Sequence, residues 1–148
     1  MISEKLLSMV LSRYGIRVLG AAERDIKYKG CCYGSSTNLQ YGYEAADDSS
    51  GSYTQAEINV YELAHKCKEW AFDLGIEVSS GKDVCKEGIN IDGYYPNINY
   101  GQWRVYCMSE AEVFEAPDDY FYADTESEAI FKACEWILSQ QEKEIKSN

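Results

Sequence analysis

The stretch from Thr54 to Gly75 places the clearest constraint on how this chain folds. Its apolar residues recur at three- and four-residue spacing, the period of one face of an α-helix (Val60, Leu63, Ala64, Cys67, Trp70, Ala71 and Leu74). Thr54 followed by Glu57 is typical of a capping box, and Gly75 supplies a C-terminal stop. The sequence therefore predicts an amphipathic helix that begins at Thr54 and ends near Gly75.

Two further helices are predicted near the ends of the chain. Helical spacing runs from Ser3 to Tyr14, and it recurs after a second capping box formed by Thr125 and Glu128. After Gln141 the chain becomes charged, which predicts a frayed tail. Short alternating or β-branched stretches between the helices predict strands (16–19, 25–33, 76–78, 89–92, 103–107, 112–116 and 120–123). We therefore expect the α+β class, with one domain over residues 1–148, an antiparallel sheet of four to six strands and three helices packed on it.

Two stretches are predicted to interrupt these elements. Residues 30–53 are dominated by Gly, Ser and Tyr, and Leu39 is their only aliphatic side chain larger than Ala. Such composition predicts a long loop, which inside a compact domain tends to be functional or disordered. Tyr41 and Tyr43 lie in it, and Tyr with Gly and Ser makes an adaptable contact surface. Residues 93–96 (Gly-Tyr-Tyr-Pro) predict a break after the strand at 89–92.

Acidic side chains gather in two stretches that contain no Lys or Arg. The net charge of the chain is −11, to which residues 30–65 contribute −5 and residues 105–131 contribute −8. Binding to nucleic-acid phosphates or anionic membranes needs clustered bases, so neither is expected. The second stretch also carries large aromatic residues, among them Tyr106, Tyr120 and Tyr122. Rings set in a one-signed field suit a basic protein surface.

Few catalytic or cofactor chemistries fit the sequence. His65 is the only histidine and lies in a helical pattern, so a nucleophile–histidine site is not expected, and ligand spacing for zinc is absent. The six cysteines show no C-x-x-C spacing and are predicted to be free thiols, with Cys67, Cys107 and Cys134 as buried apolar residues. No cofactor or metal is predicted. A redox pair at Cys31-Cys32 and converging carboxylates for a cation or for acid–base catalysis stay open.

The C-terminal residues 123–138 (ADTESEAIFKACEWIL) resemble the closing helix of small acidic phage and prophage proteins, in which a short antiparallel sheet ends in a TE-x-EA helix start. Residues 61–71 (YELAHKCKEWA) have a similar character. The resemblance covers about a third of the chain and involves caps and core positions, so it carries over no catalytic residue. It implies a mobile-element origin and an anti-defence role, as in anti-CRISPR proteins.

The leading hypothesis is a non-enzymatic inhibitor that binds a basic, nucleic-acid-handling host protein, such as a nuclease or a CRISPR effector. It requires the negative side chains of the two acidic stretches to converge into one docking surface. The expected partner-binding residues are carboxylates and tyrosines from both stretches (Glu110, Glu112, Glu115, Asp118, Asp119, Tyr120, Tyr122, Tyr41, Tyr43, Asp47 and Asp48). The N-terminus lacks the basic and apolar regions of a signal peptide, so a cytoplasmic location is expected.

Two alternatives stay open. A small-ligand or nucleotide-binding module would use the loop at residues 30–53 and a basic N-terminal face (Arg13, Arg17, Arg24, Lys27 and Lys29). A hydrolase would need two carboxylates that converge in one pocket.

Overall fold

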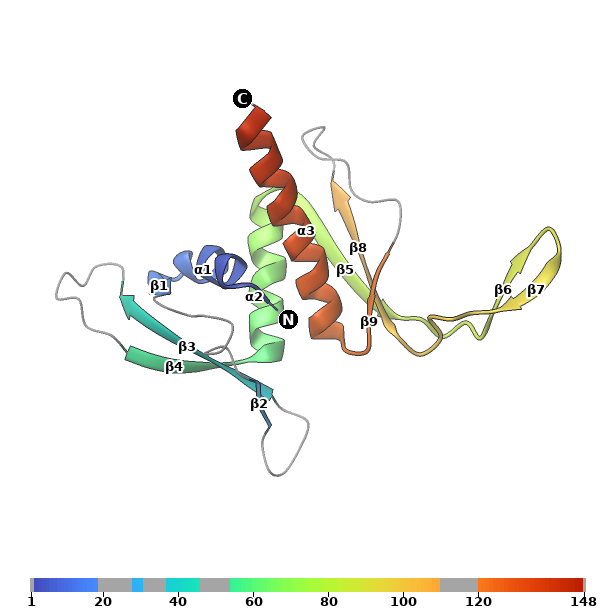
Figure 1. The fold of residues 1–148 in the computed structure, drawn as a ribbon, viewed down its shortest axis with the longest axis horizontal. Coiled ribbons are helices and arrows are strands. Elements are labelled where there is room, and N and C mark those ends of the chain that lie inside the picture. The colour runs from blue at the N-terminus through green and yellow to red at the C-terminus, as the bar shows by residue number, and fades with distance from the viewer. Residues whose placement is uncertain (1, 19–27, 31–36, 46–53, 110–119, 148) are drawn as a thin grey trace.

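The computed structural model describes residues 2–18, 28–30, 37–45, 54–109 and 120–147, and these form three helices and nine strands (Figure 1). The helices are α1 (Glu4–Ser12), α2 (Val60–Asp73) and α3 (Glu126–Ser147). The strands are β1 (Ile16–Val18), β2 (Tyr28–Gly30), β3 (Thr37–Ala45), β4 (Thr54–Asn59), β5 (Ile76–Lys82), β6 (Glu87–Asn90), β7 (Gly93–Pro96), β8 (Trp103–Ser109) and β9 (Phe121–Ala123). All strand pairs are antiparallel, and the predicted α+β class is confirmed.

The described strands form three small sheets where one sheet of four to six strands was expected. In the first sheet β3 is central and pairs with β1, β2 and β4. The second sheet has the order β5-β8-β9, and β6 and β7 form a separate hairpin. Helix α2 connects β4 to β5 and lies between the first two sheets (Figure 1). The helices therefore do not cover one continuous sheet, since α1 contacts β1 of the first sheet and α3 contacts β5, β8 and β9 of the second.

Strand β3 lies inside the stretch that was predicted as a loop. It pairs with β4 over six residue pairs, from Asn38 opposite Asn59 to Tyr43 opposite Thr54. Leu39 and Tyr41 point into the core and are buried. Leu39 and Tyr41 are two residues apart and therefore lie on the same face of the strand. The alternation typical of a strand was thus present within the stretch rich in Gly and Ser.

Helix α2 begins later than predicted, at Val60, because residues 54–59 belong to β4. The N-cap is Asn59, whose Oδ1 accepts hydrogen bonds from the backbone N–H groups of Tyr61 (2.9 Å) and Glu62 (3.4 Å). The predicted cap at Thr54 is therefore wrong. The predicted stop is confirmed, since Gly75 follows the helix with φ of 83°, a conformation that favours glycine.

The other two helices also begin at capped ends. At α1 the Ser3 Oγ accepts from the Leu6 N–H, and at α3 the Thr125 Oγ1 accepts from the Glu128 N–H at 3.2 Å. Helix α3 then continues to Ser147, so the tail predicted to fray after Gln141 is helical in the structure. Its 22 residues make it the longest of the described elements.

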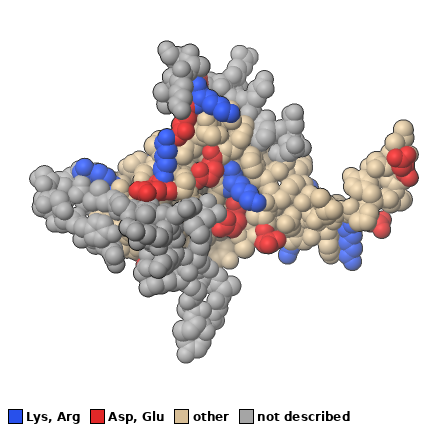
Figure 2. All heavy atoms as spheres, viewed as in Figure 1, with Lys and Arg blue, Asp and Glu red and all other residues tan. Residues whose placement is uncertain are grey.

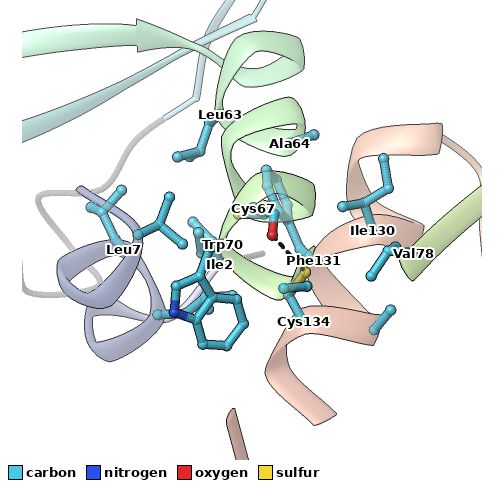
Figure 3. Packing of buried hydrophobic residues seen from close by; sticks show 14 of the residues in the cluster. Ile2, Leu7, Leu63, Ala64, Cys67, Trp70, Val78, Ile130, Phe131 and Cys134 are labelled. Carbon is cyan, nitrogen blue, oxygen red and sulfur yellow. Dashed lines mark hydrogen bonds between the residues drawn. The ribbon is translucent and has the colours of Figure 1, made fainter. Parts of the chain in front are cut away.

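The core is built around the contact between α2 and α3 (Figure 3). Phe131, Leu63 and Cys67 are fully buried there, and the Cys134 thiol donates to the Cys67 carbonyl at 3.7 Å. Helix α1 adds a row of buried residues on one side, and β5 and β8 add Ile76, Val78, Val105 and Cys107 on the other. The apolar stripe predicted for α2 is thus the centre of the core.

Polar contacts fix α1 against the other two helices. The Tyr14 hydroxyl donates to the Glu69 carboxylate at 2.6 Å, which raises the pKa of Tyr14 and lowers that of Glu69. Arg13 forms an ion pair with Asp73 of α2, and Lys5 forms one with a carboxylate of α3. These contacts lie at the surface, so the apolar row of α1 supplies most of the stabilisation.

Two phenylalanines provide a matched test of this core. Phe131→Ala is expected to lower the free energy of unfolding by about 3–5 kcal/mol, because it leaves a cavity between the helices. Phe72 of α2 is 70% exposed, so Phe72→Ala should change the free energy of unfolding by less than about 0.5 kcal/mol. Urea unfolding monitored by circular dichroism measures both, and equal losses would contradict the described packing.

The described cysteines are expected to differ in reactivity. Burial raises the pKa of the Cys107 thiol to about 12, and the contact with Cys67 together with burial holds the pKa of Cys134 well above its usual value. Cys85 is exposed. Because the thiolate is the reactive form, a maleimide should modify Cys85 in the folded chain and reach Cys67, Cys107 and Cys134 only after denaturation. Peptide mass spectrometry after labelling at neutral pH measures this, and early labelling of Cys107 would contradict it.

Candidate protein-interaction surface

The sheet β5-β8-β9 has one face on the core and one face directed outward. On β8, Val105 and Cys107 are buried, whereas Tyr106 and Met108 between them are exposed. The helices α2 and α3 contact this sheet and share its buried residues. The intervening residues of β8 therefore point away from the helices, because side chains alternate along a strand.

Three tyrosines lie together on this outer face, and we call Tyr106, Tyr120 and Tyr122 the tyrosine cluster. The ring centroids of Tyr106 and Tyr120 are 5.8 Å apart and those of Tyr120 and Tyr122 are 6.1 Å apart, both in edge-to-face orientation. The Arg104 guanidinium lies 5.3 Å from the centre of the Tyr120 ring. Such contacts orient exposed rings without burying them, and Tyr120 keeps 46% of its surface accessible.

The register of the strands brings the cluster together. Val105 pairs with Phe121 and Arg104 pairs with Tyr122, so the residues just before Phe121 and just after Val105 meet on the outer face. Phe121 points inward and packs on Trp136 of α3, with ring centroids 6.2 Å apart. The inward anchor at Phe121 thereby fixes the outward direction of Tyr120 and Tyr122.

The chain between β8 and β9 carries most of the predicted carboxylates. It leaves the sheet after Ser109, which pairs with Ile76, and returns at Tyr120 in the tyrosine cluster. Glu110, Glu112, Glu115, Asp118 and Asp119 belong to this connection and lie outside the described residues, as do Asp47 and Asp48 of the first acidic stretch. The structure thus brings Tyr120 and Tyr122 together, and convergence of the acidic stretches stays a prediction.

Tyr41 and Tyr43 are not placed as the sequence suggested. Tyr41 is only 7% exposed and belongs to the core, and burial raises its pKa. Tyr43 is half-buried and contacts Tyr41, with ring centroids 5.8 Å apart. Burial in the core leaves little of the Tyr41 side chain accessible to a partner, which is unlike the exposed position expected from the sequence.

Several described carboxylates on the helices are occupied by contacts within the chain. Glu62 pairs with Lys66 along α2, Asp73 pairs with Arg13, and Glu135 accepts the Ser3 N–H at 2.8 Å. Figure 2 shows acidic and basic side chains interspersed over the helices. Charge neutralised in this way attracts a partner weakly. Two described bases, Arg104 and Lys132, contact the tyrosine cluster. A negative field at the cluster is therefore a prediction that depends on the carboxylates of residues 110–119, which lie outside the described residues.

The alternative based on a basic N-terminal face gains little from the structure. Arg13 pairs with Asp73 of α2, and Lys5 on α1 is also in an ion pair. Arg24 and Lys27 lie outside the described residues. Lys5 and Arg13 thus attach α1 to its neighbouring helices, whereas Arg17 lies on β1 and Lys29 on β2.

The only histidine of the chain lies beside a small cavity that Lys68, Glu126 and Ser127 also line. His65 is largely exposed and pairs with Glu69 one turn along α2, at 3.1 Å. Within the described ranges no three His, Cys, Asp or Glu side chains are close enough to hold a metal ion. None of the helices in the described part of the chain is both long enough and apolar enough to cross a membrane.

The partner-binding residues expected from the sequence did not include two members of the outer face. Arg104 and Tyr106 alternate with the buried residues of β8, so their outward direction could have been predicted from the period of two. Their proximity to Tyr120 could not, because it depends on the pairing of β8 with β9.

Two neighbouring residues at the start of β9, Tyr120 just before the strand and Phe121 in it, provide a test of this arrangement. Tyr120→Ser is expected to lower the free energy of unfolding by at most about 1.5 kcal/mol, the value of an exposed aromatic contact. Phe121→Ser should cost more, approaching about 3 kcal/mol, because its ring packs on α3. Chemical denaturation measures both variants, and a larger loss at Tyr120 would show that its ring is structural.

Comparisons with protein-family models, with curated proteins and with solved structures gave no match. The resemblance to phage proteins therefore stays a prediction.

Proposed function

We propose that the chain is a non-enzymatic binding protein that recognises a basic surface on a protein that handles nucleic acid, such as a nuclease or a CRISPR effector. The observation that carries this proposal is the exposed tyrosine cluster at the two ends of a connection whose charged side chains are all carboxylates. Convergence of the first acidic stretch with the second, which the sequence hypothesis also requires, stays a prediction.

The two kinds of side chain have complementary roles in such a contact. Carboxylates act at a distance, since they attract a basic surface and orient it during the encounter. Tyrosines act at contact, because each offers a large amphipathic surface with few rotatable bonds to immobilise. Rings that already contact one another at 5.8 and 6.1 Å lose little further freedom on binding.

The inhibitory role follows from the chemistry of the proposed partner. A basic cleft that holds nucleic acid is lined by Lys and Arg, and carboxylates can take the positions of phosphates there. The tyrosines would lie where bases stack on protein. Occupation of such a cleft excludes nucleic acid, so no reaction catalysed by this chain is required.

The proposal predicts a mutational effect confined to the second acidic stretch. Affinity capture on the immobilised chain from a bacterial lysate supplies the partner, and calorimetry with the purified partner then measures affinity. Asp118→Lys with Asp119→Lys is expected to weaken binding at least tenfold, about 1.4 kcal/mol, because like charges would face each other. Tyr120→Ser in the native background should weaken it independently by loss of a contact ring.

The control variant has the same net charge but different positions. Glu4→Lys with Glu62→Lys changes exposed residues of α1 and α2, and it should leave affinity within about twofold. Duplex DNA should compete with the native chain for the partner. An unchanged affinity of the Asp118 and Asp119 variant at low salt, or binding that DNA leaves intact, would refute the proposed mimicry.

A further inference from the structure

A hairpin projects from the body of the molecule, and we call residues 82–101 the arm. It contains β6 and β7, and in Figure 1 it extends away from the three helices. Ile89 pairs with Tyr94, and Gly88 pairs with Tyr95. The sequence predicted a strand at Ile89 followed by a break at residues 93–96. The break is in fact the second strand, β7, after a turn at Ile91 and Asp92.

The arm is fixed to the body by hydrogen bonds at its base. Beyond the last pair of β5 and β8, the Asp83 N–H donates to the Gln102 carbonyl and the Gly101 N–H donates to the Asp83 carbonyl, both at 2.8 Å. Farther out, the side-chain amide of Asn97 donates to the Cys85 carbonyl at 2.6 Å. These contacts continue the β5–β8 pairing into the hairpin, so its position away from the core is built into the fold.

Apolar side chains are exposed along the whole arm. Seven of the fourteen exposed large hydrophobic residues in the described part of the chain lie in these 20 residues (Val84, Ile89, Ile91, Tyr94, Tyr95, Ile98 and Tyr100). The core cluster and the residues packed against it include none of them. A two-stranded hairpin without a covered face is marginally stable in water. The arm therefore has the composition of a surface that another molecule covers.

One face of the hairpin is more open than the other. On the first face the Tyr95 ring lies directly over Gly88, where a Cβ would overlap the ring. On the second face Ile89 and Tyr94 are paired across the strands and are 69% and 77% exposed. Nothing in the described chain covers this second pair, so it is the natural centre of a contact.

The two faces of the arm together expose an apolar area of the size that stable interfaces use. With about 150–250 Å² for each tyrosine and somewhat less for each aliphatic residue, the seven side chains expose on the order of 1,000 Å². Stable interfaces bury about 800 Å² on each partner, whereas the largest apolar patch of an ordinary monomer is about 300–600 Å².

Charge indicates which partner fits. The arm carries two lysines and three carboxylates, a net charge of −1 out of −11 for the chain. The body of a second copy carries the same negative charge and is repelled by this body, whereas the two arms carry only −1 each. Two copies of this chain can meet with least repulsion at the arm, which also holds their bodies apart.

We propose that the arm binds the arm of a second copy of this chain, with the Ile89–Tyr94 faces of two hairpins packed against each other. Packing of two apolar sheet faces covers the exposed side chains of that face in each hairpin. The contact is isologous, because the same residues of both copies form it around a two-fold axis.

Sedimentation velocity of the full chain over a concentration series tests this proposal. The native chain is expected to shift from monomer to dimer as concentration rises. Ile89→Lys with Tyr94→Lys should weaken association at least about thirtyfold, because charges would replace the apolar centre of the contact. Phe72→Lys is the matched control, since it places a lysine at an exposed apolar residue outside the arm, and it should dimerise like the native chain.

Hydrogen exchange locates the contact. Amides of residues 87–96 should become more protected as the native chain is concentrated, and this gain should vanish in the double variant. Circular dichroism confirms that the variants fold, since neither side chain belongs to the core. A native chain that stays monomeric, a double variant that still dimerises, or protection confined to residues outside the arm would each overturn the proposal.

Discussion

The contact between α2 and α3 is the interaction on which the other features depend. Phe131 and the Cys134–Cys67 contact fill the space between these helices, and the same helices cover the inner face of β5, β8 and β9. Since one face of that sheet is used for the core, the alternate residues are forced outward. The tyrosine cluster is thus a consequence of core packing, and its positions are as well determined as the buried residues between them.

Local periodicity predicted the helices because helical contacts join residues three and four positions apart. The stripe of α2 and the cap at Thr125 are examples. β3 was misassigned because it lies in residues 30–53, whose overall Gly, Ser and Tyr content is typical of loops, and because its formation depends on pairing with β4. Thr54 takes part in the same strand pairing and therefore cannot cap a helix. The N-cap of α2 is Asn59 instead.

The candidate site was predictable to the extent that it depends on alternation. Tyr120 and Tyr122 share a face two residues apart, but their contact with Tyr106 requires the β8–β9 register. Tyr41 shows the opposite case. Its position in a Gly-rich stretch predicted a surface residue, but its side chain is buried in the core. The arm was not predicted because apolar alternation indicates a strand without indicating whether anything covers its apolar face.

The uneven division of charge between arm and body has a consequence for behaviour in solution. Nearly all of the negative charge lies outside the arm, so two bodies repel each other while a basic protein is attracted. Dissolved ions weaken both the repulsion and the attraction. At physiological ionic strength these forces extend over a screening length of about 8 Å. Under the two proposals made above, added electrolyte should favour self-association through the arms and disfavour capture of a cationic protein. Ionic strength would then select between the two proposed assemblies.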